Sequence, residues 1–310
     1  MNYTVILYYK YIDIEDVTYE LNEQRKVATS FNLLGRILLA NEGINGTLCG
    51  TAADCQMYIN YMNNHMLFNN IDYKSNTSDF CCFSKLQVKI KKEIVMFGKH
   101  EILQPSYKKS APYITPDELH ETLSQKNNNL ILIDIRNHYE SRIGKFNNAL
   151  TPLVKTSREF YDYFIKNKDI FHDKDVIMYC TGGVRCEKTS AALQEATSAR
   201  SIRHLQGGIC KYIEKYPDGK FRGRNYVFDE RVSIKVNNDI LTHCDTCNIS
   251  CDLYNNCLNA LCNKHYISCD ECLQKTNGCC SEECINLTYK RIVPLRPPLP
   301  SRINSYKPLL

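Results

Sequence analysis

The sequence of 310 residues contains no hydrophobic run long enough to cross a membrane. Its first stretch, MNYTVILYYKYIDI, has polar residues alternating through it and lacks a cleavage site of small residues. It therefore predicts a β-strand and not a signal peptide. These absences argue against a membrane protein or a secreted one, and we expect a cytoplasmic protein. The chain is too long for one ordinary core, which predicts two or three domains.

Motifs for the common redox cofactors are also missing. We find no glycine fingerprint for dinucleotides, no haem motif and no facial triad, so the sequence predicts neither flavin, NAD nor haem. The net charge of +5 is a mild excess that is compatible with RNA and does not demonstrate it. We expect neither DNA nor a membrane as a partner.

Cysteine, by contrast, is abundant and unevenly distributed, since ten of the 17 cysteines lie between Cys244 and Cys284. In a reducing compartment a dense cluster points to metal or redox chemistry more than to a disulfide framework. Two Cys-x2-Cys pairs aim their sulfurs as a tetrahedral zinc ion requires. They are Cys244 with Cys247 and Cys269 with Cys272. One structural zinc site or two is one interpretation, and cysteines that fold without metal are the other. None of the common iron–sulfur spacings is present.

Residues 1–105 alternate strand and helix patterns in a βαββαβ order, which predicts a ferredoxin-like domain. Thr51 is the expected N-cap of its second helix. The last strand, KLQVKIKKEIV, has an apolar face and a basic face that carries Lys89 and Lys91. That basic face indicates either an ordinary solvated surface or a contact with RNA.

Residues 106–225 predict an α/β domain. After a linker with prolines, Thr115 and Pro116 mark a helix start as its N-cap and first residue. The apolar run NLILIDI lacks alternation and indicates a strand buried in a parallel sheet, and the strands and helices that follow it predict right-handed crossovers. Residues 226–310 form a cysteine-rich region with a proline-rich tail that we expect to be extended.

The segment VIMYCTGGVRCEKTSAALQEA predicts a strand, a glycine-rich turn and a helix that begins near Glu187. We expect Gly182 and Gly183 to take positive φ and to aim backbone N–H groups at one point, where the helix dipole and Arg185 add positive charge. A thiol at that point, Cys180, should ionise readily. This coincidence favours a catalytic cysteine over a buried inert one. The rest of the expected loop is Thr181, Gly182, Gly183, Val184 and Cys186.

Four residues separate Cys180 from Arg185, and this spacing resembles the rhodanese loop, whereas cysteine-dependent phosphatases have five. The segment IDIRNHYE, with Asp134, Arg136 and Glu140, and the closing turn LQGGI match the same domain. We expect Asp134 and Arg136 to form a structural ion pair and not to act as catalysts.

Taken together, LLANEGINGTLCG, NHYESRIGKF, YCTGGVRCEK and YVFDERV, followed by the cysteine cluster, resemble the oxygen-dependent tRNA uridine hydroxylases. The resemblance runs through nearly the whole chain. It implies an acylphosphatase-like first domain, a rhodanese-like middle domain and hydroxylation of the wobble uridine at C5, with oxygen as co-substrate. The family's essential cysteine maps to Cys180 through CTGGVRCE. A rhodanese-type sulfurtransferase that carries a Cys180 persulfide and a non-catalytic RNA- or metal-binding adaptor are the alternatives.

Two chemical routes are open for such a cysteine. The Cys180 thiolate could add to C6 of a flipped-out uridine and make C5 enolate-like, while Arg185 and the loop amides stabilise charge on the uracil oxygen. In the second route Cys180 is first oxidised or persulfidated, and Cys186 resolves it. Cys186 as a structural residue at the helix start is the alternative.

The anticodon loop of tRNA is the expected partner, because wobble bases are read when they are unstacked in single-stranded loops. Polar residues of the turn NEGINGT and arginines of KFRGRNY could contact the base or the phosphates, although a plain tight turn is the alternative for the first segment. The candidates are Asn41, Glu42, Asn45, Lys89, Lys91, Arg222 and Arg224.

Overall fold

A computed structural model describes residues 2–98 and 106–306. It divides into two compact units, one of Met1–Ser141 and Asn147–Lys220, the other of Arg142–Phe146 and Phe221–Leu310. The beginning of the expected linker and the last four residues of the proline-rich tail lie outside the described residues. Within the described ranges, no helix combines the length and the apolar character that a membrane crossing requires.

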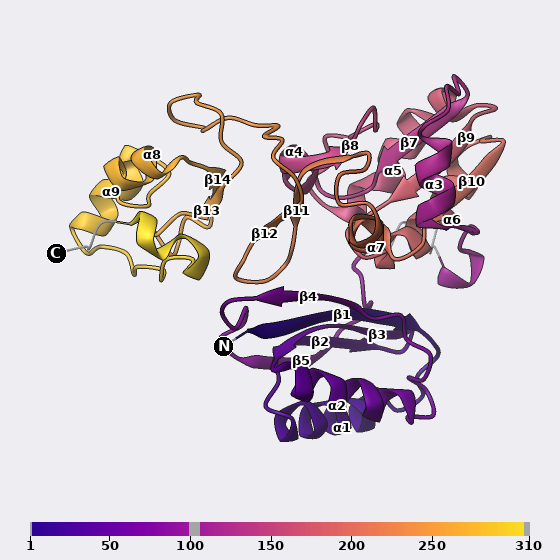
Figure 1. Ribbon diagram of the computed structural model, residues 1–310, viewed down its shortest axis with the longest axis horizontal. Helices are drawn as coiled ribbons and strands as arrows, with labels where there is room; N and C mark the ends of the chain where they lie inside the picture. The colour runs from indigo at the N-terminus through magenta and orange to yellow at the C-terminus, as the bar shows by residue number, and fades with distance from the viewer. Residues whose placement is uncertain (1, 99–105, 307–310) are drawn as a thin grey trace. The chain divides into compact units, whose positions relative to one another are not determined.

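The first domain is a five-stranded sheet with two helices on one face (Figure 1). Its order, β4-β1-β3-β2-β5, confirms the βαββαβ prediction: the weak strand β4 completes that fold, and β5 is an added edge strand parallel to β2. The elements are β1 (Tyr3–Tyr11), α1 (Val17–Ser30), β2 (Leu34–Ala40), β3 (Gly43–Gly50), α2 (Ala52–Asn63), β4 (Lys74–Ser78) and β5 (Leu86–Ile90).

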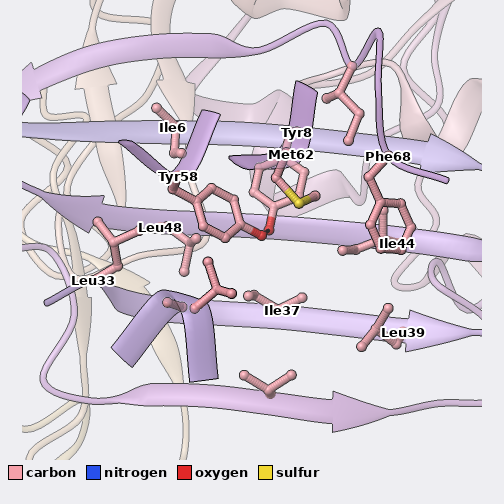
Figure 2. Packing of buried hydrophobic residues seen from close by; sticks show 14 of the residues in the cluster. Ile6, Tyr8, Leu33, Ile37, Leu39, Ile44, Leu48, Tyr58, Met62 and Phe68 are labelled. Carbon is pink, nitrogen blue, oxygen red and sulfur yellow. Dashed lines mark hydrogen bonds between the residues drawn. The ribbon is translucent and has the colours of Figure 1, made fainter. Parts of the chain in front are cut away.

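Alternate residues of these strands point at the helices and form the core of the first domain (Figure 2). Tyr8 and Tyr58 are fully buried, and their hydroxyl oxygens lie 2.5 Å apart. The Tyr58 hydroxyl donates to the side-chain oxygen of Gln24 at 2.5 Å, so the Tyr8 hydroxyl is the donor to Tyr58. Thr51 caps α2 as predicted, because its side chain accepts a hydrogen bond from the Asp54 backbone N–H.

The second domain of this unit has a four-stranded sheet that is parallel, as predicted, and its strand order is β6-β10-β9-β7. Thr115 and Glu118 form a capping box, and Pro116 is the first helical residue of α3. The main elements are β6 (Tyr113–Ile114), α3 (Pro116–Thr122), β7 (Leu130–Asp134), α4 (His138–Ile143), α5 (Phe160–Lys166), β9 (Asp175–Tyr179), α6 (Val184–Ala196), β10 (Ser201–Leu205) and α7 (Gly208–Lys215). Short 3-10 turns are η1 (Tyr107–Lys109), η2 (Ser157–Glu159) and η3 (Lys168–Phe171).

The second unit begins with a small antiparallel sheet in the order β12-β11-β8 and continues into a cysteine-rich segment with one two-stranded hairpin. Its elements are β8 (Gly144–Phe146), β11 (Phe221–Tyr226), β12 (Ser233–Lys235), β13 (Tyr254–Asn256), β14 (His265–Ile267), α8 (Asp270–Lys275), α9 (Glu282–Tyr289) and η4 (Pro300–Ser305).

The prediction of an extended tail was wrong for its described part. Arg302, in η4, is buried and donates to Asp270 at 2.8 Å and to the Ser268 carbonyl at 3.1 Å. A buried guanidinium needs such partners, so these bonds hold the tail against the start of α8.

Candidate active site

Cys180 follows β9 directly, at the carboxyl end of the parallel sheet, and its side chain is fully buried. Gly183 is the N-cap of α6 with φ 99°, and its backbone N–H donates to the Cys180 sulfur at 3.1 Å. The positive φ predicted for Gly182 was wrong, since only Gly183 of the two has it. The helix predicted to start near Glu187 begins at Val184, so Arg185 and Cys186 lie in its first turn.

The surroundings of Cys180 favour its thiolate. Burial is the largest influence and would raise the pKa of this sulfur. A hydrogen bond from the Cys186 thiol, the positive charge of Arg185 and the backbone N–H groups of Arg185 and Gly183 act in the opposite direction. Together they lower the pKa of Cys180 to about 6, so the sulfur is ionised at neutral pH.

Arg185 is held by a carboxylate that comes from another part of the domain. Its two terminal nitrogens donate to Glu140 at 2.6 and 2.8 Å, and one of them also donates to the Thr181 hydroxyl at 3.2 Å. Glu140 is fully buried, so this bidentate pair fixes the guanidinium next to Thr181 of the loop. We had not predicted this pairing, although Glu140 stood in the segment that resembled rhodaneses.

The predicted ion pair between Asp134 and Arg136 is present. The Arg136 side chain donates to both carboxylate oxygens of Asp134, at distances from 2.6 to 3.1 Å, and both side chains are fully buried. The pair links the end of β7 to the residues that precede α4.

The turn LQGGI packs against the loop that contains Cys180 and Thr181. The N–H groups of Ile209 and Cys210 donate to the carbonyls of Cys180 and Thr181 at 2.9 and 3.0 Å. Gly208, with φ 63°, passes so close that a Cβ there would lie 2.5 Å from the Cys180 oxygen. Because these bonds turn the loop carbonyls toward α7, the sulfur is left with N–H donors.

Residues of β1 cover the loop. The Tyr11 hydroxyl donates to the Val184 carbonyl at 3.2 Å, and the Tyr9 hydroxyl donates to Glu187 at 3.0 Å. A Cβ on Gly182 would lie 2.8 Å from Leu7. We had not predicted this contact, yet β1 carried a signal for it: Leu7, Tyr9 and Tyr11 alternate with the core residues of the same strand, so both faces of β1 are apolar or aromatic.

A buried lysine joins the same two domains. Lys188 is 4% exposed and contacts Glu42 at 2.6 Å and Glu93 at 2.8 Å. Glu42 was a candidate for RNA contact, and in this structure its carboxylate also accepts a hydrogen bond from the Ile94 backbone N–H. The ion pairs hold the start of α6 against the first domain.

Four of the other RNA candidates have protein partners within their own unit. Asn41 and Asn45 donate to backbone carbonyls within the first domain, each at 3.1 Å. Lys89 and Lys91 are exposed. In the second unit, two candidates have protein partners: Arg222 lies 3.4 Å from Asp239, and Arg224 donates to Ser233 at 2.8 Å.

Two groups of four cysteines could each hold a metal ion, because within each group the sulfurs all lie within 4.8 Å of one another. The first group is the one predicted, Cys244, Cys247, Cys269 and Cys272. The second, which we had not assigned, is Cys257, Cys262, Cys280 and Cys284. Its looser spacings, four and three intervening residues, gave a weaker signal than Cys-x2-Cys. None of the 17 cysteines, all of which lie in the described residues, forms a disulfide.

Three family models match consecutive parts of the chain. Residues 3–94 match the UPF0176 acylphosphatase like domain, residues 115–215 match the rhodanese-like domain, and residues 222–285 match the family described as Rhodanase C-terminal. The first two matches agree with the folds observed for these segments.

Curated relatives match over almost the full length. A tRNA uridine(34) hydroxylase from Cytophaga hutchinsonii is 36% identical, and the match covers 100% of this chain and 98% of that protein. Proteins of the same name from Acholeplasma laidlawii and Staphylococcus carnosus are 38% and 36% identical. Those two matches cover 91% and 94% of this chain and 89% and 93% of the respective relatives.

Proposed function

The chain belongs to the tRNA uridine(34) hydroxylase family, and on this premise we propose that it hydroxylates C5 of the wobble uridine of tRNA with Cys180 as the essential residue. The product is 5-hydroxyuridine. Full-length similarity to proteins of this name favours the oxidoreductase over the sulfurtransferase and the non-catalytic adaptor. The observation that carries the role of Cys180 is its ionised sulfur, which N–H donors, a thiol and a fixed arginine surround.

The chemistry starts with the Cys180 thiolate. Its electron pair forms a bond to C6 of the uracil, and the electrons of the C5–C6 double bond move toward the carbonyl at C4. C5 then has enolate character and attacks an oxygen atom. Molecular oxygen needs two further electrons from a reductant to leave one oxygen on C5 and the other as water, whereas a peroxidic species brings the oxidising equivalents itself. Loss of the proton from C5 and of the thiolate from C6 restores the double bond.

The residues of the loop have separate tasks in this scheme. The N–H of Gly183 donates to the Cys180 sulfur at 3.1 Å and keeps the thiolate ionised until it attacks. Arg185 supplies a permanent charge, and Glu140 holds it in position at 2.6 Å. Glu140 is therefore a positioning residue. The Cys186 thiol donates a hydrogen bond to the thiolate and thereby helps to keep it ionised.

Uridine can reach Cys180 only after the side chains that cover the loop move. Tyr9 and Tyr11 contact the first turn of α6, and the sulfur itself is fully buried. Tyr9 is a neutral phenol, because burial raises its pKa well above the ordinary value. When the contact opens, both rings offer an aromatic surface to a flipped-out base, as is common in RNA recognition.

The remaining assignments follow from the same premise. The anticodon loop of tRNA is the macromolecular substrate, oxygen is the co-substrate and the cytoplasm is the compartment. Cys244, Cys247, Cys269 and Cys272 hold a structural zinc ion, which is supported by the 3.7 Å between the sulfurs of Cys247 and Cys269. That ion stabilises the fold and takes no part in the chemistry.

The test measures 5-hydroxyuridine by mass spectrometry after the protein acts on unmodified tRNA. Cys180→Ser should abolish the product. Cys186→Ser should retain it, because a hydroxyl donates a hydrogen bond as well as a thiol does. Normal modification by Cys180→Ser would refute the proposed role of Cys180. If the unsubstituted protein forms a thiolated nucleoside instead of 5-hydroxyuridine, and Cys180→Ser does not form it, the result would favour the sulfurtransferase.

A further inference from the structure

The second unit contains a group of four thiols that the proposed function does not use. The sulfurs of Cys257, Cys262, Cys280 and Cys284 converge from the end of β13, the turn after it and the start of α9. We infer that these four cysteines bind a second structural zinc ion. The two zinc sites then form one cross-braced unit.

The separations between sulfurs fit one tetrahedral ion. Cys262 and Cys280 have their sulfurs 3.6 Å apart, and those of Cys280 and Cys284 are 4.0 Å apart. Zinc–sulfur bonds of about 2.3 Å in a tetrahedron place the sulfurs about 3.8 Å from one another. A disulfide would need about 2.05 Å. A cluster of several irons would hold its thiolates farther apart than a single ion does.

The polar surroundings also suit a thiolate centre. The buried side chain of Asn259 donates to the Cys284 sulfur at 3.4 Å, which is the kind of outer hydrogen bond that orients metal ligands. The neighbouring Cys279 behaves differently, since its sulfur lies 3.5 Å from the Thr288 hydroxyl and outside the group. The metal-binding group therefore includes four of the neighbouring cysteines and leaves out Cys279.

The two sites alternate along the chain. The first site takes the pairs Cys244 with Cys247 and Cys269 with Cys272. The second site takes the pairs Cys257 with Cys262 and Cys280 with Cys284, so the pairs of the two sites follow one another in turn. Cys257 and Cys262 lie in the loop between β13 and β14. Cys272 lies in α8 and Cys284 in α9, while Cys269 and Cys280 precede these helices. Each ion therefore ties together segments that flank a ligand pair of the other ion, and loss of one ion should loosen both.

This part of the chain has few other means of holding its fold. Its hydrophobic cluster consists of Leu258, Tyr266, Leu273 and three cysteines, and its regular elements are strands of three residues and helices of six and eight. Segments with so small a core usually need metal ions or disulfides, and no disulfide joins the cysteines of this segment. Zinc binding supplies folding free energy in such cases.

The first experiment is metal analysis of the full chain purified without chelator, followed by titration of the metal-free chain with cobalt(II), whose tetrahedral thiolate complexes absorb visible light. We expect two zinc ions per chain and a cobalt signal that saturates at two equivalents. One zinc ion or none would overturn the inference, and iron in place of zinc would overturn the identity of the metal.

The second experiment assigns the ligands. Cys280→Ser should lower the zinc content to one ion per chain or fewer, whereas the matched control Cys279→Ser should retain two. Two zinc ions in Cys280→Ser would refute the assignment, and if that variant does not fold, the stoichiometry of the unsubstituted chain decides. Because metal content is measured and not 5-hydroxyuridine, this result stands apart from the proposed role of Cys180.

Discussion

The hydrogen bond from Cys186 to the Cys180 thiolate can be tested through the pH dependence of the reaction. Cys186→Ala removes the thiol that lowers the pKa of Cys180 most strongly. Hydrogen bonds to charged groups contribute about 1.5–3 kcal/mol, and we take the lower end because a thiol is a weak donor. Since one pKa unit corresponds to about 1.4 kcal/mol, the pKa of Cys180 should rise by about one unit.

The direction follows from which form reacts. The depressed pKa of about 6 keeps the thiolate present at neutral pH, and the thiolate is lost as the pH falls through that value. The acid limb of kcat/KM reports the free enzyme. We expect it to move from about 6 to about 7 in Cys186→Ala, so that at pH 6 the thiolate fraction falls from about one half to about one tenth. At pH 8 both proteins should react at similar rates.

Cys186→Ser is the matched control, because its hydroxyl keeps a donor in place and should leave the acid limb near that of the unsubstituted protein. Thermal unfolding at each pH separates a shift of the limb from loss of folded protein. An unshifted limb in Cys186→Ala would refute the hydrogen-bond argument. Loss of product in Cys186→Ser would instead favour the route in which Cys186 resolves an oxidised or persulfidated Cys180.

Three further substitutions test the framework of the loop. Glu140→Gln leaves Arg185 buried without a carboxylate and should lower the free energy of unfolding by about 3–5 kcal/mol in urea titrations; a loss below about 1 kcal/mol would contradict a fixed ion pair. Lys188→Met keeps the side-chain length but removes the link to two carboxylates of the first domain, and the same titration should show a loss of about 2 kcal/mol. Gly208→Ala forces a Cβ against the Cys180 carbonyl at a strained φ, with a cost of about 1–3 kcal/mol, and 5-hydroxyuridine formation should fall while circular dichroism stays unchanged.

Local features of the fold could be predicted well from the sequence. Thr51 and Thr115 were assigned as N-caps because the hydrogen bond that defines a cap spans only three residues, and both are observed. The strand, turn and helix around Cys180 were likewise recognisable from adjacent residues. The start of α6 was placed three residues too late, because a cap formed by Gly183 with positive φ leaves no side-chain signal for the boundary.

Contacts between distant segments could not be predicted in the same way. Glu140 and Arg185 are 45 residues apart, and nothing in either local pattern states that they meet. The grouping of Cys257 with Cys280 required the path of the hairpin between them. The buried position of Arg302 depends on partners more than 30 residues earlier, so the composition of the tail alone gave the wrong structure.

The burial of Cys180 protects a sulfur whose low pKa would otherwise make it easy to oxidise. A thiolate that is ionised at neutral pH is readily oxidised when it is accessible, and the proposed reaction has oxygen as its co-substrate. Donors fixed by the fold can keep the sulfur charged without water, because the Gly183 N–H, the Cys186 thiol and the Arg185 charge take the place of hydration. The tyrosines of β1 that cover the loop then exclude solvent and solutes from the thiolate. We therefore expect the loop to be exposed when tRNA displaces that cover, so that the base that reacts is also the group that fills the opened site.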